Sequence, residues 1–159
     1  MKTLDFAINM EQEGYKYYAE QAEFNKDNEL QKVFQVLSKS EKEHAALLQK
    51  RKKQEAFDLN AKFELPEIKN VFKSLKNFRK EHTTKQLDVY KLASSQEEKS
   101  IDLYNDMLSK SSDDKDKELF TFLIKQEKEH LILFEELVAM LMRPEEWVEN
   151  AEFGEREEY

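Results

Sequence analysis

Apolar residues recur at helical spacing along four long stretches of this sequence. The first stretch runs from Thr3 to about Phe24, and the second runs from Leu30 to about residues 53–56. A capping-box pattern, Thr83-x-x-Gln86, predicts the start of a third helix that ends near Ser109. The fourth stretch extends to about Met142, shortly before Pro144. We therefore expect four long amphipathic helices and an all-α fold.

The connections between these helices predict how they are arranged. Two short polar segments, residues 25–28 and 111–114, fit tight turns between antiparallel helices. Residues 57–82 form a longer connection in which apolar spacing predicts a short helix over residues 67–80. The chain is then one domain over residues 1–143, a four-helix bundle of two helical hairpins, about 3–56 and 83–142, joined by one crossover.

An acidic segment with aromatic residues, 144–159, follows the fourth helix. We expect this tail to pack on its own bundle. The alternative is a dimer contact, because the crossover helix and the tail offer additional apolar surface. We expect the protein to form a homodimer.

Charge and composition exclude several classes of function. The net charge is 26 − 34 = −8, which argues against nucleic acid as a partner. No run of 18 apolar residues is present, so no membrane span is predicted. The absence of cysteine excludes disulfides, thiolate zinc sites and iron–sulfur clusters, and it agrees with a cytoplasmic location.

The sequence also contains an internal repeat with a step of 86 residues. The tetrapeptide Glu-Lys-Glu-His occurs at 41–44 and again at 127–130. The same step carries Glu11 onto Glu97 and Tyr18 onto Tyr104. Because the shared residues are mostly ones that bind metals, the repeat points to function rather than to packing alone.

Helix geometry places the repeated residues at one level of the bundle. Glu11 lies 15.5 residues before the centre of the first turn at 26.5, and the midpoint of Glu41 and His44 lies 16 residues after it. At a rise of about 1.5 Å per residue, these levels agree within about 1 Å. The second hairpin repeats the same spacing around position 112.5. If the two hairpins pack about a pseudo-twofold axis, the residues that converge in the core are Glu11, Glu41, His44, Glu97, Glu127 and His130.

Four carboxylates in a protein core would cost much free energy or bind protons unless cations neutralise them. Two divalent cations would balance four carboxylates, and oxygen-rich ligation with imidazole suits iron or manganese better than copper or zinc. The alternative interpretation is a buried polar network without metal.

The residues in this pattern resemble those of the ferritin-like di-iron carboxylate proteins, and among these the rubrerythrin-like branch. The resemblance rests on Glu41-x-x-His44, Glu127-x-x-His130, and two longer motifs around Glu11 and Glu97, covering about residues 3–142. The longer motifs are Ala7-x-x-x-Glu11-x-x-Gly14-x-x-x-Tyr18 and Ala93-x-x-x-Glu97-x-x-Ser100-x-x-x-Tyr104.

The resemblance implies two iron ions, with manganese or zinc as possible substitutes, and a protein that reduces hydrogen peroxide or dioxygen. By the same resemblance, Glu41 and Glu127 would bridge the metals, Glu11 and Glu97 would be terminal ligands, and each histidine would bind one metal.

Two departures from that family stand out. Rubrerythrins carry a second carboxylate three residues after the first on the third helix, where this chain has Ser100. That carboxylate is implicated in the metal movement of rubrerythrin peroxidase chemistry, so its absence counts against this activity in the present chain. Rubrerythrins also carry a four-cysteine rubredoxin domain, whereas this sequence contains no cysteine, so the electron donor is expected to be separate.

Several residues near the expected ligands have two interpretations. Tyr18 and Tyr104 are either core residues or hydrogen-bond donors to ligand carboxylates. Gly14 either leaves room for dioxygen or peroxide or allows close helix packing. The acidic neighbours of the ligands are expected to point toward solvent; they are Glu13, Glu43, Glu98 and Glu129.

Two other functions remain open from the sequence. The chain is either a ferroxidase that handles iron or a metal-binding protein without turnover. A small oligomer would argue against iron storage. A protein that binds metal but is redox-silent would favour the metal-binding protein without turnover.

Overall fold

The computed structural model describes residues 2–27, 30–60 and 79–142 of the chain. These residues form four helices and no strand, which confirms the predicted all-α four-helix bundle. The helices are α1 (Lys2–Phe24), α2 (Leu30–Lys52), α4 (Arg79–Ser109) and α5 (Asp114–Met142). The predictions for the crossover helix, the tail and the dimer contact fall largely outside the described residues and stay predictions.

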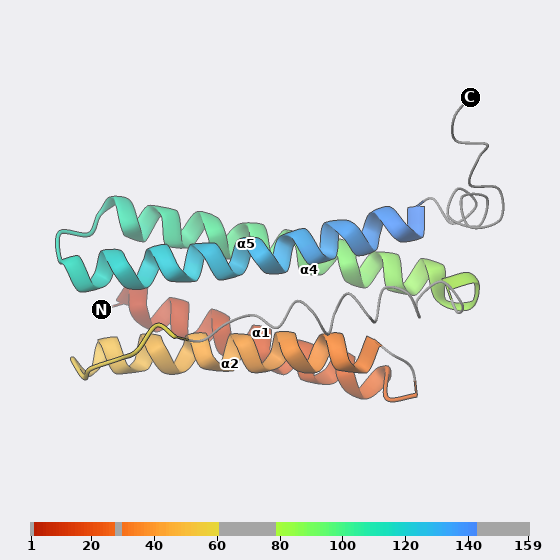
Figure 1. Ribbon diagram of the computed structural model, residues 1–159, viewed down its shortest axis with the longest axis horizontal. Coiled ribbons are helices and arrows are strands. Elements are labelled where there is room, and N and C mark those ends of the chain that lie inside the picture. Colours follow the sequence, from red (N-terminus) through yellow and green to blue (C-terminus); the bar gives the residue numbers. More distant parts are fainter. Residues whose placement is uncertain (1, 28–29, 61–78, 143–159) are drawn as a thin grey trace, which may run out of the picture.

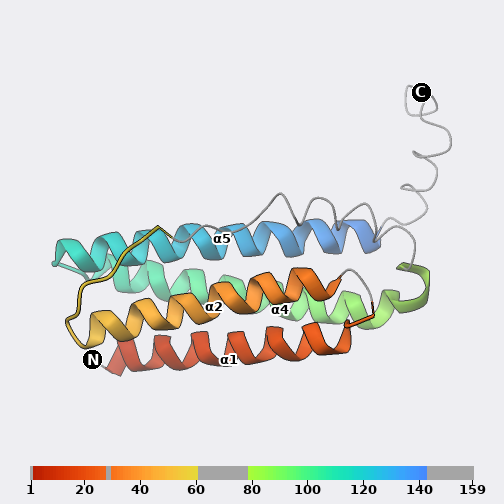
Figure 2. The same ribbon diagram turned by 60° about the horizontal axis from the view of Figure 1, so that its bottom comes forward.

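The four helices form two antiparallel hairpins that lie side by side (Figures 1 and 2). The turn between α1 and α2 lies at the opposite end of the bundle from the turn between α4 and α5 (Figure 1). A half-turn about an axis across the bundle would therefore exchange the hairpins. This arrangement matches the repeat, because a step of 86 residues carries α1 onto α4 and α2 onto α5.

One helix boundary differs from the expectation. The third long helix begins at Arg79, about one turn before Thr83, where the capping-box pattern placed its start. Arg79, Lys80 and Glu81 are strong helix formers, so the helix extends through the Thr83-x-x-Gln86 pattern. Local propensity therefore outweighs the capping signal at this position.

Two other helix ends show known capping arrangements. Asp113 accepts hydrogen bonds at Oδ1 from the backbone N–H groups of Lys115 (2.7 Å) and Asp116 (3.4 Å), so it caps α5. At the end of α2, Gln54 takes a left-handed conformation with φ 59°, and the N–H of Glu55 donates to the carbonyl of Lys50 at 2.8 Å. This is the Schellman arrangement that usually employs glycine.

Two apolar clusters fill the two halves of the bundle. One contains Leu30, Phe34 and Leu137 near the turn between α1 and α2. The other contains Leu48, Leu119 and further residues near the turn between α4 and α5. The polar residues predicted to bind metal lie at the level between these clusters, so the helices hold them in a layer with apolar packing on both sides.

None of the described helices contains a stretch long and apolar enough to cross a bilayer.

Candidate metal centre

All six residues predicted from the repeat meet in the bundle interior. Each of the four helices contributes at least one of them, and each residue is at most 4% exposed. The six are Glu11, Glu41, His44, Glu97, Glu127 and His130. The helical spacing that placed them on inward faces is thus confirmed, although the sequence could not show how their polar atoms meet.

The six residues form two overlapping groups of potential metal ligands. In the first group, Glu11 and His44 meet Glu41 and Glu127, and in the second, Glu97 and His130 meet the same two glutamates. The ligand atoms of each group lie within 4.8 Å of one another. Glu41 and Glu127 are therefore the shared residues, as expected for carboxylates that bridge two cations.

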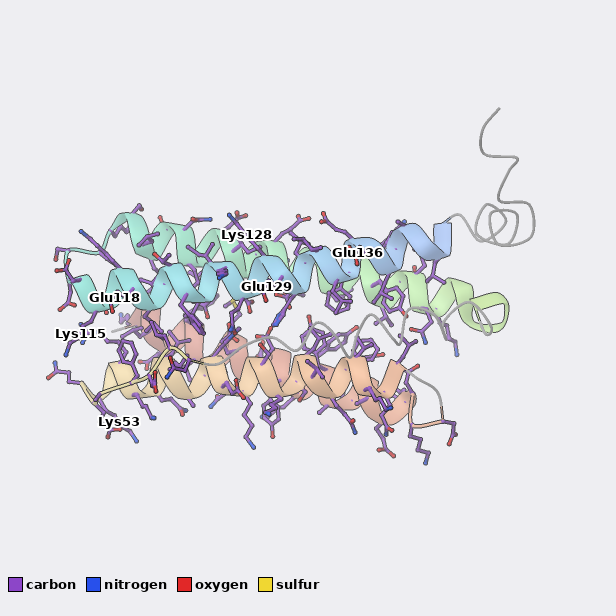
Figure 3. The ribbon with its side chains drawn as sticks, viewed as in Figure 1. Lys53, Lys115, Glu118, Lys128, Glu129 and Glu136 are labelled. Atoms are coloured by element: carbon purple, nitrogen blue, oxygen red, sulfur yellow. The ribbon has the colours of Figure 1, made fainter. Side chains whose placement is uncertain are left out.

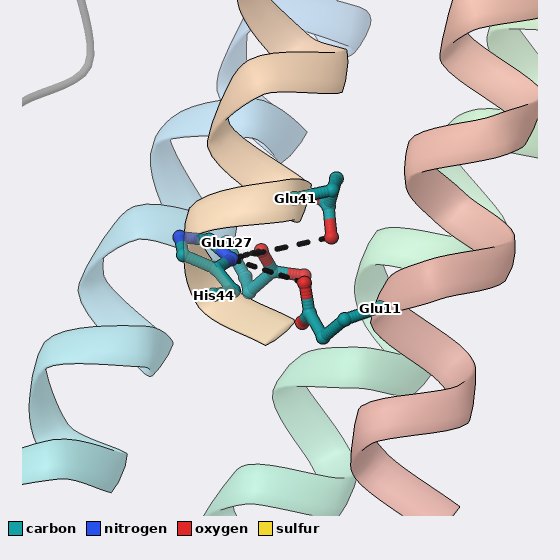
Figure 4. Close-up of side chains that lie close together, drawn as sticks. All are labelled: Glu11, Glu41, His44 and Glu127. Carbon is teal, nitrogen blue, oxygen red and sulfur yellow. Dashed lines mark hydrogen bonds and ion pairs between the residues drawn. The ribbon is translucent and has the colours of Figure 1, made fainter. Parts of the chain in front are cut away.

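His44 directs Nδ1 toward carboxylates of both hairpins (Figure 4), and His130 does the same. His44 Nδ1 lies 3.2 Å from Glu11 Oε2 and 3.0 Å from Glu127 Oε1. His130 Nδ1 lies 3.0 Å from Glu41 Oε1 and 3.4 Å from Glu97 Oε1. The shortest Nδ1 contact of each imidazole therefore reaches the shared glutamate of the opposite hairpin, so the centre joins the two hairpins.

The shared glutamates are poorly suited to carry charge without a cation. Burial raises the pKa of Glu41 well above its ordinary value of 4.5, and the nearby Glu11 and Glu127 carboxylates raise it further. Burial also raises the pKa of Glu127 well above 4.5, with Glu11 and Glu97 adding to the shift. Without a metal ion, these two carboxyl groups are held toward the protonated form.

The two terminal glutamates and His44 are instead held toward their charged forms. Burial would raise the pKa of Glu11, but His44 and hydrogen bonds from its neighbours outweigh that effect and lower it. His130 lowers the pKa of Glu97 in the same manner. Burial opposes charge on His44, yet Glu11 and Glu127 raise its pKa well above 6.5. Buried charge is thus paired where a partner is in reach.

The donor set fits divalent cations. Glu97 Oε2 and Glu127 Oε2 are buried and accept no hydrogen bond from the described residues, which is a costly state for carboxylate oxygens. Cations in the centre would satisfy these atoms and reverse the repulsion among the four carboxylates. The buried carboxylate and histidine cluster therefore has the composition of a di-metal site.

Two tyrosines support the terminal glutamates from the opposite hairpin. The Tyr18 hydroxyl donates to Glu97 Oε1 at 2.6 Å, and the Tyr104 hydroxyl donates to Glu11 Oε1 at 2.7 Å. Their rings also stack in the core: Tyr18 on Phe34 and Phe134, and Tyr104 on Phe120. The two interpretations left open by the sequence therefore both apply.

Replacing Tyr18 with phenylalanine is expected to weaken metal binding without unfolding the protein. The ring stacking is retained, but Glu97 loses the donor that orients it, and such losses cost about 10- to 100-fold in metal affinity. Metal titration of Tyr18→Phe and Tyr104→Phe, followed by calorimetry, would measure the effect. Tyr15→Phe is the matched control on the same helix, because the Tyr15 ring faces Lys42. Equal affinities in all three variants would contradict the assigned role.

The acidic neighbours of the six residues do not join the centre. Glu13 and Glu98 are exposed, whereas Glu43 and Glu129 are half-buried rather than fully solvated. Figure 3 shows Glu129 and the exposed Lys128 on α5. These two residues follow Glu127 directly in the sequence. None of these four glutamates belongs to either ligand group, so the predicted distinction between the two faces of each helix holds.

Sequence reasoning missed two residues at the outer edge of the centre. His44 Nε2 lies 2.6 Å from Gln126 Oε1, and His130 Nε2 lies 2.9 Å from Ser40 Oγ. Both partners are buried and directly precede the repeated tetrapeptides. The step of 86 residues carries Ser40 onto Gln126. The repeat is visible only at positions where its two copies are identical, and this pair differs.

A cavity of about 250 Å³ lies between α1 and α4 beside the centre. Glu41 and Glu97 line its inner part, and Gly14 and Ser100 line its wall. A Cβ built on Gly14 would lie 3.5 Å from Glu41 Oε2, which is an ordinary contact. Gly14 is therefore not required by close packing, and its missing side chain leaves space next to the shared glutamate.

Comparison with known proteins gives one family. A family model described as Rubrerythrin matches residues 2–138, a range that contains all six residues of the centre. Searches for similar curated proteins and for similar solved structures found no match.

Proposed function

The chain belongs to the rubrerythrin family, and we propose that it is a di-iron oxidoreductase that reduces hydrogen peroxide or dioxygen. The observation that carries this proposal is the pair of ligand groups that share Glu41 and Glu127. Oxygen-rich ligation with one imidazole for each metal favours iron or manganese, with zinc as a substitute. Two Fe(II) ions would supply the two electrons that cleave an O–O bond.

The protein residues would hold the ions and limit the water around them. Glu11 and His44 would hold one ion, Glu97 and His130 would hold the other, and Glu41 and Glu127 would contact both. The apolar clusters on either side keep the bulk solvent away from this layer. Pairs of carboxylates that can alter their contacts suit a metal that changes charge during the reaction.

Tyr18 and Tyr104 hold protons next to the terminal glutamates. Burial and the charge of Glu97 raise the pKa of Tyr18 well above 10. Burial and Glu11 do the same to the pKa of Tyr104. Both phenols therefore stay protonated at neutral pH and keep Glu97 Oε1 and Glu11 Oε1 in fixed positions through their hydrogen bonds.

The cavity between α1 and α4 offers a small oxidant access to the centre. Its size suits dioxygen or peroxide, and it reaches Glu41 and Glu97 from a surface that includes the exposed Glu13 and Gln96. Ser100 occupies the position of the additional family carboxylate, and its hydroxyl donates to the backbone carbonyl of Gln96 at 3.1 Å. Metal movement toward such a carboxylate is therefore not part of this proposal.

Replacing Gly14 with leucine is expected to slow the reaction with oxidant while leaving metal binding intact. The larger side chain would fill part of the cavity beside Glu41, whereas the six ligand residues remain unchanged. Stopped-flow oxidation of the Fe(II)-loaded protein by peroxide measures the rate. Ala19→Leu adds the same side chain at an exposed position of α1 and serves as the control. Equal rates in the two variants would show that the cavity is not the access route.

The proposed reaction is tested by anaerobic loading with Fe(II) followed by hydrogen peroxide. We expect two Fe(II) to be oxidised for each peroxide consumed, with the balance 2 Fe(II) + H₂O₂ + 2 H⁺ → 2 Fe(III) + 2 H₂O. The Zn(II)-loaded protein should consume no peroxide, which controls for reaction with methionine. Stable Fe(II) in the presence of peroxide and air would rule out the redox function and leave a metal-binding protein.

A further inference from the structure

Both histidines of the centre have their outer nitrogen held by a neutral side chain. Gln126 Oε1 lies 2.6 Å from His44 Nε2, and Ser40 Oγ lies 2.9 Å from His130 Nε2. Gln126 is 5% exposed and Ser40 is 7% exposed, so water does not compete freely for these contacts. We propose that Gln126 and Ser40 are positioning residues that fix each imidazole for metal binding through Nδ1.

The chemistry of the amide explains this role for Gln126. An amide oxygen can only accept a hydrogen bond, so His44 must carry its proton on Nε2 when it contacts Gln126 Oε1. The lone pair of the neutral ring is then on Nδ1, the atom that faces Glu11 and Glu127. A metal ion at that position would meet the correct tautomer without any rearrangement of the ring.

Ser40 can do the same for His130. A hydroxyl oxygen accepts a hydrogen bond through its lone pairs, so the Nε2–H group of a metal-bound His130 would donate to Ser40 Oγ. Ser40 Oγ also lies 3.4 Å from His44 Nε2, so it stands between the two rings. The rings themselves are stacked, with centroids 5.8 Å apart and planes 16° from parallel.

The two positioning residues act across the hairpins. Gln126 is on α5 but contacts the histidine of α2, and Ser40 is on α2 but contacts the histidine of α5. Each half of the centre therefore depends on a residue that directly precedes the shared glutamate of the other hairpin. Gln126 should therefore affect mainly the metal held by His44. If Gln126 acted only through its neighbour Glu127, which belongs to both ligand groups, it would affect both metals equally.

The inference rests on the proposed metal centre, but it does not depend on the reaction performed there. It is tested by anaerobic Co(II) titration, because the absorption of bound Co(II) reports affinity and ligand geometry without turnover. Two variants with one histidine each, His44→Ala and His130→Ala, separate the two halves. Gln126→Met retains the approximate size of the side chain but removes the acceptor.

We expect Gln126→Met to weaken Co(II) binding about 10- to 100-fold in the His130→Ala protein, where His44 holds the metal. The same change should have little effect in the His44→Ala protein. Ser40→Ala should cause its larger loss in the His44→Ala protein, because Ser40 Oγ lies nearer to His130 Nε2 (2.9 Å) than to His44 Nε2 (3.4 Å). Gln126→Glu restores a hydrogen-bond acceptor, so it should recover the Co(II) affinity. It should also shift the Co(II) absorption bands from those of the protein with Gln126, because a carboxylate makes the imidazole a stronger electron-pair donor to the metal.

Equal weakening in both single-histidine proteins would overturn the proposal and assign the effect to Glu127 or to packing. If a single-histidine protein fails to fold, the two-step titration of the otherwise unchanged protein decides. Gln126→Met should then weaken one Co(II) equivalent and spare the other, and loss of both or of neither would overturn the proposal. A wild-type protein that binds Fe(II) and Co(II) with no effect of either Gln126 variant contradicts the positioning role alone. A wild-type protein that binds neither ion contradicts the metal centre as well.

Discussion

Replacing Glu41 or Glu127 with alanine is expected to leave a protein that cannot bind two metal ions. Each of these glutamates belongs to both ligand groups, so its removal takes a ligand from both metals at once. Removal of Glu11 or Glu97 takes a ligand from only one group. We therefore expect the stoichiometry to fall below one tightly bound metal in Glu41→Ala and Glu127→Ala, measured by elemental analysis after anaerobic loading with Fe(II).

The matched controls are Glu43→Ala and Glu129→Ala. These glutamates lie two positions after the shared ones, are half-buried, and belong to neither ligand group. Both control variants should retain two metals. Glu41→Gln keeps the size of the side chain and separates loss of a ligand from loss of packing, because it should lose metal while remaining folded. The same stoichiometry in all variants would contradict the assignment of helix faces.

The metal-free protein is expected to lose stability as the pH rises. The metal-loaded protein is expected to gain stability over the same range. Glu41 and Glu127 have folded pKa values raised above 4.5, so their contribution to stability is full below that pH and is lost as the pH rises through the raised values. The pKa of His44 is also raised, so its contribution to stability is likewise lost as the pH rises above 6.5 and through the raised value. The lowered pKa values of Glu11 and Glu97 add stability above 4.5 that is lost only at lower pH.

The expected result is a metal-free Tm that is highest at mildly acidic pH and falls toward pH 8. Protons compete with metals for the same atoms, so metal binding should strengthen over the same range. At a free metal concentration of about 100 times Kd, binding adds about 2.7 kcal/mol, or about 5–10 °C in Tm for a chain of this size. Differential scanning calorimetry with chelator and with Mn(II), between pH 5 and pH 8, measures both forms.

The control is the double variant Glu41→Gln, Glu127→Gln, whose side chains cannot ionise. Its metal-free Tm should depend less on pH than that of the wild type, and metal should no longer raise it. A wild-type metal-free Tm that increases steadily from pH 5 to pH 8 would contradict the proton-binding state assigned to the two shared glutamates.

The sequence predicted the buried layer of carboxylates and histidines well because helical geometry leaves few alternatives. Two polar turns and a fixed rise per residue place Glu11 level with Glu41 and His44 in the first hairpin. The repeat places Glu97 level with Glu127 and His130 in the second. Burial then follows from their positions on apolar faces, and the structure confirms it. Periodicity is strong evidence in a bundle because each residue has only one angular position.

Contacts between the hairpins could not be predicted in the same way. The sequence left open whether Tyr18 was a core residue, because its hydrogen bond reaches Glu97, 79 positions away on the other hairpin. The contact of Gln126 with His44 spans 82 positions. Such pairs depend on how two helices are rotated and spaced, which is determined by packing over the whole interface rather than by local pattern.

One local signal was misleading. The Thr83-x-x-Gln86 pattern has the residue types of a capping box, yet α4 already begins at Arg79. A capping pattern marks a helix start only where the preceding residues leave the helical conformation, and residues 79–82 favour it.

We expect side chains from both hairpins to hold a pair of metal ions in the polar layer of the bundle. Anomalous diffraction from a crystal soaked anaerobically in Fe(II) would locate these ions. We predict two iron peaks, one beside Glu11 and His44 and the other beside Glu97 and His130, with Glu41 and Glu127 contacting both. Iron bound only at the surface, or an iron-free interior in which these carboxyl groups pair with one another, would contradict this expectation.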